Sequence, residues 1–254
     1  MFLRCPKCGH SPLPADQALP AACPACGVIL AKVAATGTAR APRNTTPADE
    51  DTGTQRDPWL HLLLHLPERV DPLRWWLRVA LLAGFALWGL WLMALDVRSG
   101  EIMGSFIHLP LLVFHEAGHV IFMPFGHTLT VLGGTLGQWL MPLILAGALL
   151  LKNRDPFGAA LALWLLGVSV MDAAPYMYDA LQPQLMLLSG RTGEEGGHDW
   201  IELFSTWALL PRAQAIGLAT HKLGALLMLA ALGWAAWVLK LQHTRLDART
   251  LHED

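Results

Sequence analysis

The sequence has few charged residues, and they form no block of one sign. Only 15% of its 254 residues are Asp, Glu, Lys or Arg, and the formal net charge is −2. Because no run is rich in lysine and arginine, the chain lacks the electrostatic signature of nucleic-acid binding, and no nucleic-acid partner is expected. The apolar core of a signal peptide is also missing after residues 1–4, so no cleaved leader is predicted.

Cysteine is absent after position 26, which excludes disulfides from the rest of the chain. The four cysteines form two CPxCG motifs, at residues 5–9 and 23–27, and this spacing indicates a metal site. In each motif a tight turn presents two thiolates to one tetrahedral ion, and the following glycine tolerates the positive φ that the turn needs. The pattern predicts a zinc ribbon over residues 1–33, with one structural Zn²⁺ bound by Cys5, Cys8, Cys23 and Cys26.

A rubredoxin-like iron site is the alternative for these thiolates. It is disfavoured because Phe2 is the only aromatic residue there to shield a redox centre. Four reduced thiols predict a cytosolic N-terminus. A small unit of this kind is typical of a structural element or of a docking surface for a cytosolic partner. Residues 34–58, rich in Thr, Pro and Ala, are predicted to be a disordered linker.

Apolar residues make up 54% of the chain, and the sequence contains 11 tryptophans. The long apolar stretches predict an all-α polytopic membrane bundle with about four full spans plus short or re-entrant elements. The membrane domain is expected over residues 59–242, followed by a polar tail at residues 243–254. The stretches expected to be helical are residues 75–95, 102–125, 136–151, 157–178 and 223–239. Lysine and arginine outside the first and last stretches predict cytosolic ends, and hence an integral protein of the cytoplasmic membrane if the source is bacterial.

Residues 126–135 interrupt this apolar pattern. Thr and Val alternate there with apolar residues, and Gly133-Gly134 follows, which predicts a short strand or β-hairpin. Because the segment is too short to span a bilayer, it is expected to be re-entrant and to line a water-filled cavity.

The apolar stretch at residues 102–125 contains an HExxH motif at residues 115–119. On a helix, residues four apart lie on the same face, so His115 and His119 can bind one metal ion together. Glu116 is turned about 100° from His115, where it can take a proton from water that the metal activates. Such residues are costly in a membrane segment and usually functional there. We therefore interpret the motif as a catalytic Zn²⁺ site with Glu116 as the general base.

The motif leaves the third metal ligand open, with four candidates: Asp172, Asp179, His198 and Asp199. Asp172 is preferred because it lies well inside an apolar stretch, where an unpaired carboxylate is expensive. No Lys or Arg occurs between residues 155 and 190 to pair with it, so a metal ion is a suitable partner. The alternative is a buried carboxylate that is hydrogen-bonded to a neighbouring helix. The other three candidates are expected nearer the water interface, where charge is solvated.

Together these features resemble the site-2 protease family of membrane-embedded zinc metallopeptidases. The resemblance covers roughly residues 75–180 and rests on the intramembrane HExxH, the glycine-containing stretch after it and an Asp in a later helix. That family takes its third zinc ligand from such an Asp, usually followed by Gly, whereas Ala173 follows Asp172 here. The resemblance implies zinc-dependent hydrolysis of peptide bonds in a membrane protein or peptide substrate, within or beside the bilayer.

Two other functions are compatible with the same residues. The zinc site could hydrolyse a lipid or a small molecule, because zinc chemistry alone does not select a substrate. Alternatively, the chain is a non-enzymatic membrane scaffold or sensor whose ribbon binds a cytosolic partner, with a structural metal at the HExxH motif. A coordination sphere closed by His198 would favour this last function, since structural zinc sites leave no open position.

Overall fold

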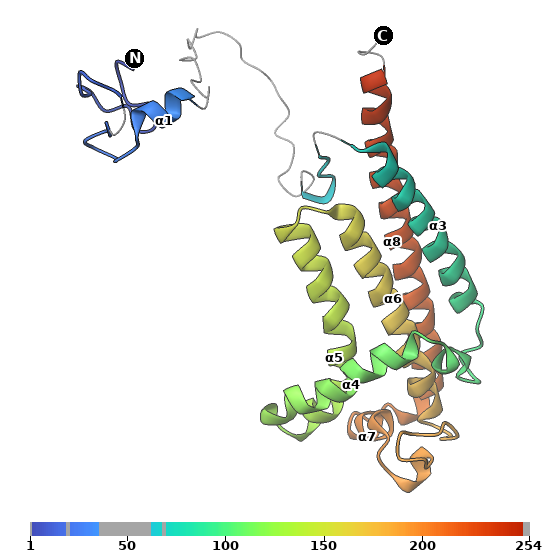
Figure 1. Cartoon of the computed structure of the whole chain (residues 1–254). Helices are drawn as coiled ribbons and strands as arrows, with labels where there is room; N and C mark the ends of the chain where they lie inside the picture. Colours follow the sequence, from blue (N-terminus) through green and yellow to red (C-terminus); the bar gives the residue numbers. More distant parts are fainter. Residues whose placement is uncertain (1, 19–20, 36–61, 68–69, 251–254) are drawn as a thin grey trace, which may run out of the picture. The chain divides into compact units, whose positions relative to one another are not determined.

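The computed structural model describes residues 2–18, 21–35, 62–67 and 70–250. Within these ranges the chain forms seven α-helices, and its only β-structure consists of isolated bridges (Figure 1). The chain divides into two compact units, Met1–Thr54 and Gln55–Asp254. The predicted all-α architecture is therefore confirmed for the described residues.

The N-terminal unit contains two similar turns followed by α1 (Leu30–Ala35). In the first turn the N–H of Gly9 donates to the carbonyl of Cys5, and in the second the N–H of Gly27 donates to that of Cys23, both at 2.9 Å. Gly9 and Gly27 have φ of 74° and 72°, the left-handed conformation that glycine tolerates best. The first two residues of the predicted linker belong to α1, and residues 36–58 lie outside the described ranges.

The second unit is built on four long helices: α3 (Pro72–Met93), α5 (His127–Gly147), α6 (Pro156–Asp179) and α8 (Ala213–Thr250). Four helical segments of the described residues are long and apolar enough to cross a membrane, namely Pro72–Met93, His127–Lys152, Pro156–Asp179 and Leu210–Leu246. The expectation of about four spans is confirmed. The final helix extends to Thr250, so much of the predicted polar tail is a continuation of α8.

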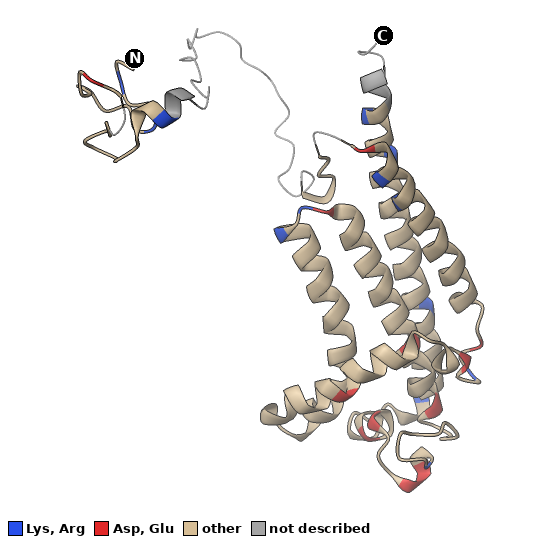
Figure 2. Ribbon diagram, in the orientation of Figure 1, with Lys and Arg blue, Asp and Glu red and all other residues tan. Residues whose placement is uncertain are grey.

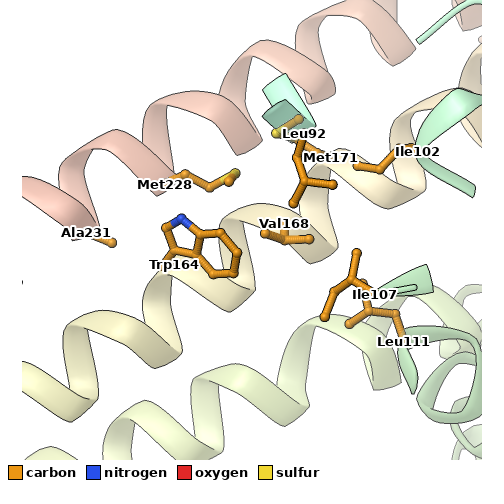
Figure 3. Close-up of a cluster of buried hydrophobic side chains, with 9 residues drawn as sticks. All are labelled: Leu92, Ile102, Ile107, Leu111, Trp164, Val168, Met171, Met228 and Ala231. Atoms are coloured by element: carbon orange, nitrogen blue, oxygen red, sulfur yellow. The ribbon is translucent and has the colours of Figure 1, made fainter. Parts of the chain in front are cut away.

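Helix α6 is the most buried of the four and packs closely on α8. A Cβ on Gly167 of α6 would lie 2.8 Å from the carbonyl oxygen of Gly224 in α8, so the two backbones approach each other through glycine. Side chains from α3, α6, α8, the segment before α4 and the first turn of α4 form one apolar cluster (Figure 3). Its buried members are Leu92, Ile102, Ile107, Leu111, Trp164, Val168, Met171, Met228 and Ala231. The cluster fixes the start of α4 against the bundle.

The predicted helix at residues 102–125 is not one membrane span. It consists of η1 (Glu101–Gly104), α4 (His108–Phe122) and η2 (Met123–Phe125), and α4 runs across one end of the bundle (Figure 1). A helix of 15 residues is about 22 Å long, which is shorter than the hydrocarbon core of a bilayer at about 30 Å. The HExxH motif therefore lies at an end of the bundle and not halfway along a span.

The hairpin predicted for residues 126–135 is wrong, because this segment forms the first turns of α5. The glycines that suggested a turn serve helix packing. A Cβ on Gly118 of α4 would lie 2.0 Å from the carbonyl oxygen of Gly133, and one on Gly137 would lie 2.5 Å from that of Phe114. Close contact between α4 and α5 thus requires glycine on both helices, and this tertiary contact outweighs local strand propensity. Residues 136–151 continue α5 and its π-helical end η3 (Ala148–Lys152), so they belong to the same span.

Charge is distributed unequally between the two ends of the bundle (Figure 2). The end where α3 begins and α8 finishes carries mainly basic residues: Arg74, Arg78, Lys152, Arg154, Lys240 and Arg245. The end formed by α4, α7 (Asp199–Thr206) and the loop before α7 carries most of the acidic residues that the structure describes in this unit: Asp96, Glu101, Glu116, Asp179, Glu194, Glu195, Asp199 and Glu202.

Candidate metal centres

Two groups of side chains among the described residues could hold a metal ion. One consists of the four cysteines, and the other of His115, Glu116 and His119; within each group the ligand atoms lie within 4.8 Å of one another. The two groups belong to different units of the chain.

The cysteine cluster has the dimensions of a tetrahedral thiolate site. The Sγ atoms of Cys5 and Cys26 are 3.6 Å apart, those of Cys8 and Cys23 are 3.8 Å apart, and all four cysteines are free. Zn–S bonds of about 2.3 Å in tetrahedral geometry separate sulfur atoms by about 3.8 Å. Burial raises the pKa of Cys5, but hydrogen bonds from the backbone of Cys8 and Lys7 outweigh it and lower that pKa to about 6. The predicted convergence of the four cysteines is confirmed, and the spacing of their sulfur atoms fits one metal ion.

Replacing Cys8 and Cys26 together with Ser is expected to remove one equivalent of metal from the purified protein. Hydroxyl groups are poor ligands for a site built for thiolates, whereas the HExxH group lies in the other unit and keeps its donors. Metal content by mass spectrometry, with Ser11→Ala as the matched control, measures the change. If the double variant keeps both equivalents of metal, or loses both, the prediction of two independent metal sites is wrong.

In the second group, hydrogen bonds orient the two imidazole rings. Nδ1 of His119 lies 2.8 Å from the carbonyl oxygen of Thr130, which can only accept, so Nδ1 carries a proton and Nε2 is the nitrogen that could bind a metal. Nδ1 of His115 lies 3.4 Å from Oε1 of Gln138. The backbone of α5 passes close to the two Nε2 atoms, because a Cβ on Gly134 would lie 2.5 Å and 2.6 Å from Nε2 of His115 and His119. Glycine at this position makes room for the histidine pair.

Asp199 supplies a third donor at the same point. Its Oδ2 lies 2.9 Å from Nε2 of His115 and 3.3 Å from Nε2 of His119. Tetrahedral zinc with bonds of about 2.0–2.1 Å would separate such donors by about 3.4 Å, so both distances from Asp199 are close to those expected for ligands of one ion. The hydrogen bond to Asp199 raises the pKa of His119 to about 9. Burial raises the pKa of Asp199, but hydrogen bonds with His115 and His119 outweigh it and lower that pKa. Because an ion must displace the proton of His119, metal binding is expected to weaken at low pH.

Asp199 is the first residue of α7, and its position is set by its neighbours. Its N–H donates to the hydroxyl oxygen of Tyr176 at 3.0 Å. Nδ1 of His198, the N-cap of α7, accepts from the N–H of Ile201 at 3.3 Å. Nε2 of His198 faces Oδ2 of Asp179 at 3.4 Å. His198 and Asp179 therefore contact each other and support α7, and neither reaches the histidine pair.

The structure does not place Asp172 in the group of possible ligands around His115 and His119. Its Oδ1 accepts from Nδ1 of His108 at 2.9 Å, and its Oδ2 accepts from Nε2 of Gln138 at 2.8 Å. The buried carboxylate thus obtains its partners from neighbouring helices, which removes the need for a metal ion. Gln138 is hydrogen-bonded to both Asp172 and His115, so Asp172 contacts the histidine pair only indirectly.

Sequence reasoning missed His108 altogether. Burial lowers the pKa of His108, but the hydrogen bond to Asp172 outweighs it and raises that pKa. The signal was present in the helical register, since His108, Leu112, His115 and His119 follow one face of α4 at spacings of four, three and four residues.

A cavity of about 570 Å³ joins these groups. The face of α4 that carries His108, His115 and His119 lines one side of the cavity. Gln138, Asp172 and Tyr176 line other sides. The loop before α7 contributes residues 186–189, 191 and 195–197, and Glu116 is exposed to the cavity. The arrangement places an ionisable acid next to three convergent donors in a space large enough for a peptide segment.

Comparison with known proteins gives no match to any family model, curated protein or solved structure. The fold and the two clusters define the class of the chain, a multi-span membrane protein with two candidate metal-binding sites.

Proposed function

We propose that the chain is a membrane-bound zinc metallopeptidase that hydrolyses peptide bonds in or next to the membrane. The observation that carries the proposal is the position of Glu116. It lies in the cavity beside two imidazoles and a carboxylate that point at one another, but it belongs to a different face of α4 from His115 and His119. That set of residues has the composition of a catalytic zinc site, in which three protein ligands leave a fourth position open.

Zinc bound by His115, His119 and Asp199 would lower the pKa of water in its open position to about 7 and polarise the substrate carbonyl. The protein side chains then move the protons. Glu116 takes one proton from the water molecule whose oxygen attacks the carbonyl carbon, and it delivers that proton to the amide nitrogen as the C–N bond breaks. Tyr176 keeps Asp199 in place, because its hydroxyl oxygen accepts from the Asp199 N–H.

The orientation of the Asp179–His198 pair argues against a closed, structural metal site. A fourth protein ligand from His198 would complete the coordination sphere, but this imidazole faces Asp179 and caps α7. The scaffold function therefore has less support than hydrolysis. The cavity itself does not distinguish a peptide from a lipid ester, so the substrate must be tested directly.

The basic end of the bundle is proposed to face the cytosol, following the positive-inside rule. In a bacterium the HExxH cavity would then open at the outer face of the cytoplasmic membrane. The reduced thiols of the N-terminal unit favour the cytosol as well, where that unit could bind a cytosolic partner.

The test of this function uses the full chain in liposomes together with a peptide that spans the membrane once. The peptide carries a fluorophore and a quencher on either side of the point where it leaves the bilayer. We expect cleavage that stops when 1,10-phenanthroline removes zinc and resumes when Zn²⁺ is added back, because the proposed step requires the ion. Soluble casein serves as the comparison substrate, and released fatty acid is measured in parallel. Fatty-acid release without peptide cleavage would identify a lipid hydrolase, and a zinc-loaded protein that cleaves neither substrate would favour the scaffold.

A further inference from the structure

The connection between α4 and α5 is unusually apolar for a turn between helices. It consists of Met123, Pro124, Phe125 and Gly126 and follows Phe122, the last residue of α4; the side chains of Met123 and Phe125 are 60% and 65% exposed. Turns that face water are normally rich in Gly, Asn, Asp and Ser, because these residues satisfy the backbone and are readily solvated. From residue 117 to residue 151 the sequence contains no Asp, Glu, Lys or Arg.

Helix α4 is polar on the inside and apolar on the outside. The face described above, with its three histidines, lines the cavity. The exposed large apolar side chains of its outer surface include Leu109, Val113, Val120 and Ile121, and Val113 is 66% exposed. A helix at the surface of a water-soluble protein has the opposite arrangement, with its apolar stripe packed against the core. An exposed apolar surface that follows a whole helix and its turn marks an interaction site.

We propose that α4 and η2 lie in the interface of the lipid bilayer, with the outer face of α4 and the Phe122–Phe125 turn in contact with acyl chains. The partner is lipid because this surface continues into a membrane span. α5 begins two residues after Phe125, and its own exposed side chains include Leu143 and Ile144. At 15 residues α4 is too short to cross the bilayer, and Glu116, at the edge of this face nearest the cavity, is the only Asp, Glu, Lys or Arg in α4.

This placement also narrows the substrate, a consequence that rests on the proposed function. The cavity would open at the boundary between lipid and water, so the best substrates would be polypeptide segments that emerge from the membrane. The exposed Met186 and Leu188 belong to the loop on the opposite side of the cavity and contribute apolar side chains to the same opening.

The experiment places a photoreactive residue at single positions of the full chain in phosphatidylcholine liposomes. Val113→p-benzoylphenylalanine and Val120→p-benzoylphenylalanine test the outer face of α4. Leu87→p-benzoylphenylalanine, at an exposed position of α3, provides the lipid-facing reference, and Ser99→p-benzoylphenylalanine, beside Asp96 and Arg98, provides the hydrated control. After illumination, intact mass spectrometry distinguishes adducts with phosphatidylcholine from cross-linked dimers.

We expect adducts with the mass of one phosphatidylcholine at positions 113 and 120, in a yield comparable with that at position 87. At position 99 we expect no phosphatidylcholine adduct. Cross-linked dimers at positions 113 and 120 would assign the surface to a second copy of the chain and overturn the proposal. Protein without adducts at these positions, while position 87 reacts, would overturn it as well. Leu109→p-benzoylphenylalanine replaces either variant that fails to fold. Adduct formation does not require hydrolysis, so the result stands even if the chain proves inactive.

Discussion

Replacing Asp199 with Asn is expected to lower the affinity of the HExxH site for Zn²⁺ by more than about 100-fold, the upper range for residues that only support a metal ligand. The substitution keeps the shape of the side chain but removes the negative charge that lies 2.9 Å and 3.3 Å from the two Nε2 atoms. Zinc retained per protein is measured during dialysis against chelators of increasing strength. The cysteine cluster provides an internal reference, because it should release its metal at the same chelator strength in every variant.

Asp172→Asn is the matched control, because it makes the same chemical change in the same cavity. Its carboxylate is connected to His115 only through Gln138, so the expected loss of zinc affinity is no more than about 10- to 100-fold. Thermal unfolding of both variants shows whether a loss of zinc affinity is confined to the site or reflects a less stable fold. If Asp172→Asn releases zinc more readily than Asp199→Asn, Asp172 is the ligand and the assignment of Asp199 is wrong.

Glu116→Gln is expected to lower kcat/KM for peptide cleavage by about 10²- to 10⁴-fold while the zinc content stays unchanged. Glutamine has the size of glutamate but cannot accept the proton of the attacking water. His119→Ala, in contrast, removes a donor atom and should abolish both zinc binding at this site and cleavage. Cleavage of the single-span peptide and zinc content are measured on the same preparations.

Glu194→Gln is the control for this experiment, since Glu194 is an exposed acid at the same end of the bundle and does not line the cavity. It should leave both quantities unchanged. A Glu116→Gln variant that loses its metal would make Glu116 a ligand, which its position within 4.8 Å of the histidine donors would allow. A variant that retains full activity would place the general base elsewhere.

The features that could be predicted from the sequence depend on residues close together in the chain. Helical periodicity places His115 and His119 on one face, and each CPxCG motif makes its own turn, so both clusters follow from spacing alone. Spans near residues 75–95, 157–178 and 223–239 follow from continuous apolar runs, because a helix satisfies its backbone hydrogen bonds without help from other segments.

Only the tertiary structure brought Asp199 to the histidine pair and set the conformation of residues 126–135. Asp199 is 84 residues from His115, and no local pattern connects them. Burial of Asp172 correctly indicated a partner, but a metal ion and the His108–Gln138 pair satisfy a carboxylate equally well, and choosing between them requires the packing of α4, α5 and α6. The glycines at 133 and 134 suggest a turn when considered alone. They form a helix here because α4 approaches α5 so closely that a side chain at these positions would collide with the backbone of α4 or with its histidines.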